Sequence, residues 1–241
     1  MLPPTFDALV VHTRPLSPSV REIAFARSDG APFEFEPGQW VSLLLPSPEG
    51  EIRRAYSIAS PPRHDATFEV AVTRVLGGAG SHALHTLEPG QTVRVIGPQG
   101  FFTRPSDAPP ALFIGTGTGL APLRSMLHAQ ASGAPVWLLF GARTEDDLLY
   151  RDDLEALATA HPGVRVVETL SQAGESWLGR RGYVQTHARA LYEELAREAA
   201  GTGGAPHVYA CGLERMVGAV RALFRQEMGL PRQLVHSERY D

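Results

Sequence analysis

The chain has 241 residues, of which 43% are hydrophobic, enough for one large or two ordinary domains with real cores. Its formal net charge of −4 comes from mixed signs without a basic stripe, so no nucleic-acid partner is expected. It has no apolar run of about 18 residues and no signal peptide, so we expect a cytoplasmic protein with no membrane contact. The predicted elements leave no amphipathic stripe uncovered, so we expect a monomer.

Two residue counts limit the chemistry. The single cysteine, Cys211, allows neither an internal disulfide nor a cysteine-ligated iron–sulfur cluster. The sequence contains no lysine, which excludes a P-loop and an internal Schiff base with pyridoxal phosphate. Any redox chemistry therefore needs an organic cofactor.

From residue 5 to about residue 100, short strands alternate with clusters of Pro, Gly and Ser. The predicted strands cover residues 6–12, 20–27, 40–45, 52–59, 67–75 and 92–96. Their spacing predicts a six-stranded antiparallel β-barrel as the N-terminal domain. One helix is expected within it, over 81–87, with Ser81 as its N-cap after Gly77, Gly78 and Gly80. Such a glycine-rich turn before a helix suits a phosphate group.

A proline-rich stretch at 104–110 marks the domain boundary, which gives domains 1–104 and 105–241. Beyond it, strands and helices alternate, which predicts a C-terminal α/β domain with a parallel sheet and helices on both faces. The predicted strands cover residues 112–114, 136–140, 164–170, 208–210 and 233–236. The predicted helices run to about residue 131 and over 152–159, 184–199 and 215–228. Ligands of such sheets bind at the carboxyl ends of the strands.

The stretch 111–122 is the most informative part of this second domain. Four apolar residues lead into Gly115, Gly117 and Gly119, and apolar residues then recur at helical spacing. Glycines let the backbone approach a diphosphate, and the following helix N-terminus attracts its charge. The third position of the G-x-G-x-x-G fingerprint falls on Leu120, so a turn built only for close packing remains the alternative.

Several short motifs follow one another in a set order along the chain. They are Phe35-Glu-Pro-Gly-Gln-Trp40, Arg54-Ala55-Tyr56-Ser57, G-x-x-S-x-x-L at 78–84, Glu88-Pro-Gly with Gly97-Pro-Gln-Gly-Phe-Phe102, G-x-G-T-G-x-A-P at 115–122, and Tyr209-Ala-Cys211-Gly212. Together they resemble the ferredoxin–NADP reductase family of flavoproteins over nearly the whole chain. Each motif alone is weak, and their common order carries the resemblance.

The resemblance implies FAD on the barrel, NADPH or NADH on the α/β domain, and hydride transfer between nicotinamide C4 and flavin N5. The implied flavin contacts are Arg54, Ala55, Tyr56, Ser57, Val72, Thr73, Gly78, Gly80 and Ser81. The implied nucleotide contacts are Gly115, Thr116, Gly117, Thr118, Gly119, Ser171, Cys211 and Gly212. The resemblance places Ser57, Cys211 and Glu238 beside the reacting rings as the catalytic residues.

Two positions depart from the family pattern. NADP-specific members carry a Ser-Arg pair where this chain has Ser171-Gln172, so Arg143, Arg180 and Arg181 are the candidate ligands of a 2′-phosphate. The choice between NADH and NADPH stays open. Plastid-type members end on an aromatic residue that covers the flavin; here Tyr240 is penultimate, and it either shields the ring or packs on the surface.

No metal site is expected, because His82 and His85 lack a third ligand at a suitable spacing. The resemblance implies a separate ferredoxin or flavodoxin as electron acceptor, since the chain cannot hold a cysteine-ligated cluster itself. The alternatives are an NADH-dependent reductase component of an oxygenase, a free-flavin reductase, or a non-catalytic flavin-binding electron-relay subunit of a larger complex.

Overall fold

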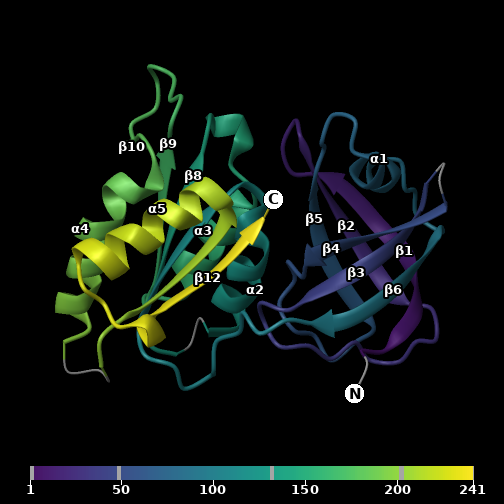
Figure 1. Ribbon diagram of the computed structural model, residues 1–241, viewed down its shortest axis with the longest axis horizontal. Helices are drawn as coiled ribbons and strands as arrows, with labels where there is room; N and C mark the ends of the chain where they lie inside the picture. The colour runs from purple at the N-terminus through teal and green to yellow at the C-terminus, as the bar shows by residue number, and fades with distance from the viewer. Residues whose placement is uncertain (1–2, 48–49, 131–132, 201–203, 241) are drawn as a thin grey trace.

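The computed structural model describes residues 3–47, 50–130, 133–200 and 204–240, which form two domains side by side (Figure 1). Within these ranges the N-terminal domain holds a six-stranded antiparallel sheet and the C-terminal domain a six-stranded parallel sheet covered by helices. The predicted fold class is confirmed.

The first sheet has its strands in the order β4-β3-β6-β1-β2-β5. They are β1 (Thr5–Pro15), β2 (Val20–Arg27), β3 (Trp40–Ser47), β4 (Gly50–Ser57), β5 (Thr67–Thr73) and β6 (Thr92–Gln99). Although β4 and β5 lie at opposite ends of this order, Ile58, directly after β4, bridges Val70 of β5. The sheet therefore curls until its edges meet, as a barrel requires.

Apolar side chains that alternate along the strands fill the barrel. Ile23 and Phe25 of β2 pair with Val70 and Phe68 of β5, and all four are fully buried. The rings of Phe25 and Phe68 stack with centroids 5.3 Å apart. Burying one side chain of this size contributes about 1.5–3 kcal/mol to the free energy of folding. The apolar residues that alternate in the sequence therefore form the core of this domain.

The helix of the barrel domain, α1 (Ala79–His85), begins and ends two residues earlier than predicted. Its N-cap is Gly78, and the prediction that Ser81 caps the helix is wrong. The Ser81 hydroxyl is instead used within the preceding turn: it donates to Gly78 O at 3.0 Å and accepts a hydrogen bond from the Val75 amide at 3.0 Å. It therefore fixes the loop between β5 and α1.

The second sheet has the order β10-β9-β8-β7-β11-β12, with every pair of strands parallel. Its strands are β7 (Ala111–Thr116), β8 (Val136–Ala142), β9 (Val164–Leu170), β10 (Arg180–Arg181), β11 (His207–Leu213) and β12 (Val235–Tyr240). The helices are α2 (Leu120–Gln130), α3 (Arg151–Ala160), α4 (Val184–Glu198) and α5 (Glu214–Ala222). Short turns of other helix types lie at Gly117–Gly119, Glu145–Asp147, Leu223–Glu227 and Arg232–Leu234.

The helices cover both faces of this sheet, α4 and α5 on one face and α2 and α3 on the other (Figure 1). Strand residues alternate between the two layers: Phe113 packs with the α2 side, whereas Leu112 and Ile114 pack with the α4 and α5 side. Strands buried on both faces have near-continuous apolar sequences. For this reason β7, β8 and β11 could be predicted from the sequence.

Two elements differ from the predictions at the end of the domain. The strand β12 extends to Tyr240, four residues beyond the predicted end, because it pairs with β11 as far as Leu213. The regular helix α5 stops at Ala222, and the chain continues as a wider π-helical turn over Leu223–Glu227. No helix in the described part of the chain is long and apolar enough to cross a membrane.

The position of β7 determines where a ligand of this sheet binds. The chain passes from β7 to β8 on one side of it, whereas β11 lies on the other side. In open α/β sheets, ligands bind outside the carboxyl ends of the strands at the point where the strand order reverses in this way. Here these ends belong to β7 and β11, where Gly115 is in register with Cys211.

Candidate active site

The ends of β4 and β12 meet at the junction of the two domains. Tyr240 Oη donates a hydrogen bond to Ser57 Oγ at 2.5 Å, and Ser57 Oγ donates to Glu238 Oε1 at 3.2 Å. In Figure 1, β12 runs toward the barrel and the C-terminus lies between the domains. The structure therefore brings Ser57, Glu238 and Tyr240 together, and Tyr240 is a half-buried part of this junction rather than a surface residue.

Cys211 lies next to this group, in register with Glu238 on β12 and with Gly115 on β7. The side chain is completely buried. Burial and the nearby Glu238 carboxylate raise the pKa of the Cys211 thiol far above its usual range. Because the thiolate is the reactive form, the buried thiol of Cys211 is unsuited to nucleophilic attack.

Two acidic groups of the site also keep their protons more strongly than usual. Burial raises the pKa of Glu238, and the hydrogen bond from Ser57 offsets part of that rise. Burial, followed by the proximity of Cys211, holds the pKa of Tyr240 well above its usual range. The Tyr240 phenol is therefore a hydrogen-bond donor at neutral pH.

The raised pKa of Glu238 predicts a pH dependence of stability. The folded protein binds this proton more tightly than the unfolded chain does, so the contribution is present below the unfolded value of 4.5 and is lost as pH rises through the folded pKa. Glu238→Gln should remove this loss. Denaturant titrations of both proteins at several pH values above 4.5 should show wild-type stability falling relative to the variant. Parallel curves would contradict the prediction.

The turn Gly117–Gly119 packs directly on the end of β11. A Cβ atom on Gly119 would lie 2.3 Å from the Cys211 carbonyl oxygen, whereas a Cβ on Gly117, at φ +54°, would have nothing within 4 Å. The buried hydroxyl of Thr116 has no hydrogen-bond partner in the described structure. An open backbone at the N-terminus of α2 fits a diphosphate.

On the barrel, Arg54 and Tyr56 provide a cation and an aromatic surface along β4. The exposed Arg54 side chain crosses α1 at Gly80, where an added Cβ would lie 2.8 Å from Arg54 Cγ. Tyr56 is half-buried against the barrel core, and burial raises its pKa. An exposed guanidinium and a ring at the same strand fit a cofactor with a phosphate and a planar ring system. Ala55, between them, is exposed.

The end of β5 contacts the nucleotide-type turn of the other domain. Thr73 Oγ1 lies 3.3 Å from Thr118 Oγ1, a hydrogen bond that joins the two domains. The Val72 side chain is buried in the barrel core, and its carbonyl accepts a hydrogen bond from His85 Nε2 at 3.0 Å when that nitrogen carries the proton. No part of Val72 is therefore exposed in this structure.

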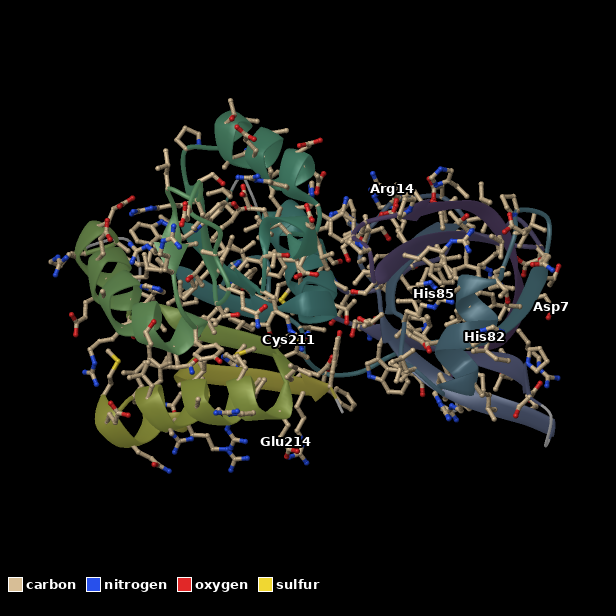
Figure 2. The ribbon with its side chains drawn as sticks, turned by 90° about the horizontal axis from the view of Figure 1, so that it is seen from above. Asp7, Arg14, His82, His85, Cys211 and Glu214 are labelled. Atoms are coloured by element: carbon tan, nitrogen blue, oxygen red, sulfur yellow. The ribbon has the colours of Figure 1, made fainter. Side chains whose placement is uncertain are left out.

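His82 and His85 lie on α1 of the barrel, well separated from Cys211 (Figure 2). No group of three or more His, Cys, Asp or Glu side chains able to hold a metal occurs in the described ranges. Neither His82 nor His85 belongs to such a group in these ranges.

The three arginines that are candidate ligands of a 2′-phosphate differ in their exposure and in the hydrogen bonds that they already make. The Arg181 guanidinium donates to the carbonyls of Ala173, Gly174 and Trp177, so it holds the loop between β9 and β10. Arg143 is exposed, and its carbonyl accepts a hydrogen bond from Gln172, which places it beside Ser171. Arg180 is half-buried in β10.

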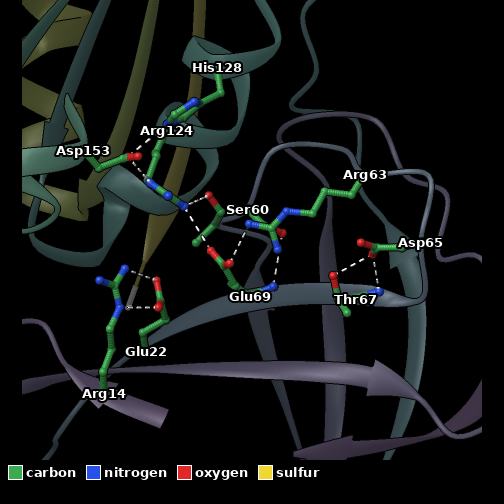
Figure 3. A network of polar contacts seen from close by, with 11 residues as sticks. Arg14, Glu22, Ser60, Arg63, Asp65, Thr67, Glu69, Arg124, His128 and Asp153 are labelled. Carbon is green, nitrogen blue, oxygen red and sulfur yellow. Dashed lines mark hydrogen bonds and ion pairs between the residues drawn. The ribbon is translucent and has the colours of Figure 1, made fainter. Parts of the chain in front are cut away.

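One residue of the domain junction escaped the sequence analysis. Arg124, on α2, is buried between the domains and binds groups in both, as Figure 3 shows. An arginine within an apolar helical pattern was the available signal, since a buried charge needs partners.

Comparison with known proteins agrees with this architecture. The domain family described as "Oxidoreductase FAD-binding domain" matches residues 7–103, and "Oxidoreductase NAD-binding domain" matches residues 113–222. Ferredoxin--NADP reductase B of Sorangium cellulosum (strain So ce56) is 58% identical over 242 residues, covering 98% of each protein. The chain belongs to the ferredoxin–NADP reductase family.

Two further proteins that resemble this chain are longer than it is. The reductase component of phenol 2-monooxygenase from Pseudomonas sp. (strain CF600) is 34% identical over 85% of this chain and 57% of its own length. Among solved structures, the ferredoxin reductase in carbazole 1,9a-dioxygenase matches 99% of this chain and 70% of its own, with 26% identity and a TM-score of 0.83. The likeness therefore extends over both domains.

Proposed function

We propose that this protein is an FAD-dependent oxidoreductase that moves electrons between NADPH or NADH and a separate one-electron carrier, a ferredoxin or a flavodoxin. The observation that carries the proposal is the junction itself: Ser57 at the end of the proposed flavin strand contacts Glu238 and Tyr240 at the carboxyl edge of the nucleotide-type sheet. The full-length likeness to a protein named ferredoxin–NADP reductase supports the same activity.

FAD, when bound, supplies the chemistry by accepting a hydride from nicotinamide and releasing electrons one or two at a time. The chain would hold it on the barrel domain, which we place at residues 1–104. In this proposal Tyr56 would stack on the ring system, and Arg54 and the turn Gly78 to Ser81 would bind the phosphates. Ala55, Ser57, Val72 and Thr73 would complete the site, and Tyr240 would cover the ring from the other domain.

The domain that we place at residues 105–241 would hold the nicotinamide nucleotide, with its diphosphate on the turn from Gly115 to Gly119. Ser57, Cys211 and Glu238 would then border the reacting rings, with Gly212 next to Cys211 on β11. The buried thiol excludes water without competing as a nucleophile, and the Glu238 carboxyl can hold a proton close to Ser57. These residues position the rings and control protons, which is the protein's share of such reactions.

We infer that the electron carrier lies outside these 241 residues, because their single cysteine cannot ligate an iron–sulfur cluster. A second function is favoured by other relatives, whose names describe reductase components of oxygenases. In that case the acceptor is an oxygenase component and NADH the donor. A flavin-binding relay subunit without its own catalysis is the third candidate.

Anaerobic titration of the purified yellow protein with NADPH and with NADH tests the proposal. Flavin bleaching by either nucleotide, followed by turnover with ferricyanide and with a ferredoxin or flavodoxin, is the expected result. Bleaching with no transfer to either carrier favours the oxygenase component, and no oxidation of either nucleotide leaves only the relay subunit.

Arg143 and Ser171 are the pair that we propose to bind the 2′-phosphate of NADPH, because Arg181 is occupied by three loop carbonyls and Arg180 is half-buried in β10. A charged hydrogen bond of this kind is worth about 1.5–3 kcal/mol. Arg143→Ala should therefore weaken NADPH binding by about 10- to 100-fold. NADH, which lacks the phosphate, is the internal control and should bind unchanged. Equal losses for both nucleotides, or none, would contradict the assignment.

A further inference from the structure

We infer that Arg124 is a positioning residue for hydride transfer: it joins the end of the proposed flavin strand to the helix that follows the nucleotide turn, and so sets the distance between the two rings. Arg124 lies five residues after Gly119, on the side of α2 that faces the barrel. The inference rests on the proposed function, since it assigns a role within that reaction.

The contacts of Arg124 reach both domains from one guanidinium. Its Nη1 donates to the Ala59 carbonyl at 2.8 Å and to Glu69 Oε2 at 3.2 Å, both in the barrel. Its Nε donates to Asp153 Oδ2, on α3 of its own domain, at 2.7 Å. Ala59 lies two residues after Ser57, so the bond to its carbonyl acts close to the proposed flavin contact.

The partners of Arg124 are themselves fixed, as Figure 3 shows. Arg63 holds the other oxygen of Glu69 at 2.8 Å, and His128 Nε2 lies 2.9 Å from Asp153 Oδ2. The Glu69 amide donates to Ser60 Oγ at 3.1 Å, and the Glu69 carbonyl accepts a bond from the Ala59 amide at 2.7 Å.

Burial makes this connection stiff. The Arg124 side chain is only 6% exposed, and its guanidinium carbon lies 4.3 Å from the centre of the buried Tyr150 ring. A planar guanidinium can bind several acceptors in fixed directions, whereas a lysine ammonium of the same charge cannot. If the Arg124 guanidinium moved away from Glu69 or Asp153, a buried charge would be left without its partner. The connection between the domains therefore has a single favourable arrangement.

Arg124→Lys tests the inference, because it keeps the charge and removes the planar fork. We expect FAD content and the dissociation constant of NADP⁺ to stay within about threefold of wild type, and flavin reduction at saturating nucleotide to slow about 100-fold, the cost of about 1 Å of misplacement. Calorimetry of the holoprotein gives a readout independent of activity: the single unfolding transition of wild type should split into two.

Arg63→Lys is the matched control, since it is the same substitution on the same carboxylate but within the barrel alone. It should leave flavin reduction within about twofold of wild type. Equal slowing in both variants, or a wild-type reduction rate and a single transition in Arg124→Lys, overturns the inference. If Arg124→Lys does not fold, Asp153→Asn, which removes one anchor, should slow reduction about tenfold, and a wild-type rate there overturns it too. A wild-type protein that no nucleotide reduces contradicts the proposed function instead.

Discussion

Tyr56→Ala is expected to purify largely without flavin. The ring of Tyr56 is half-buried against the barrel core and is the aromatic surface of the proposed flavin strand. Losing a stacked aromatic contact together with its buried area costs about 2–4 kcal/mol, which weakens FAD binding about 30- to 1,000-fold. The ratio of flavin to protein absorbance after gel filtration, and a titration of the apoprotein with FAD, measure the loss.

Tyr56→Phe is the matched control, because it keeps the ring and removes only the hydroxyl. It should retain flavin at close to the wild-type ratio. If Tyr56→Ala keeps its full flavin and an unchanged spectrum, β4 is not the flavin strand, and the proposed roles of Arg54 and Ser57 fail with it.

Gly119→Ala is expected to disrupt the nucleotide domain. The added Cβ would lie 2.3 Å from the Cys211 carbonyl oxygen and 2.6 Å from Gly212 Cα, and both are backbone atoms that cannot turn aside. The turn or β11 must therefore move, at a cost of about 3 kcal/mol. We expect the melting temperature to fall by about 6–12 °C, and nucleotide binding to weaken at least about 100-fold.

Gly218→Ala is the control for this substitution. Gly218 lies on the exposed side of α5, where an added Cβ meets nothing within 4 Å. The same change should there stabilise the protein by about 0.5–1 kcal/mol, because alanine favours a helix. Calorimetry and nucleotide titration of both variants provide the comparison. A Gly119→Ala protein that melts and binds like wild type would show that the turn is not tightly packed on β11.

Local sequence patterns predicted most of the helices and strands, because the spacing of apolar residues within each segment shows which of its faces are buried. Continuous apolar runs identify β7 and β8, and alternation identifies β2 and β5, since each strand's neighbours are fixed by its own side chains. β10 has only Arg180 and Arg181, which carry no apolar signal, and the end of β12 is charged. β10 forms because it pairs with β9, and the end of β12 forms because it pairs with β11. Such pairing cannot be predicted from a local sequence pattern.

The same limit applied to the site. Glycine spacing and the sequence from Arg54 to Ser57 identified candidate residues one segment at a time, and the structure brings Ser57, Cys211 and Glu238 together. Arg124 was missed because its importance depends on Glu69 and Ala59, which lie in the other domain. Ser81 was misplaced because a serine near a glycine-rich helix start can bind the preceding turn as readily as cap the helix.

The contact between Ser57 and Tyr240 also bears on the order of folding. Hairpins such as β1 with β2 join neighbouring parts of the chain and need only short loops to close, whereas Ser57 and Tyr240 meet only after both domains have formed. Domain docking takes from milliseconds to minutes. The hydrogen bond between Ser57 and Tyr240 therefore joins residues 183 positions apart in the sequence, and it can form only when the two domains have docked.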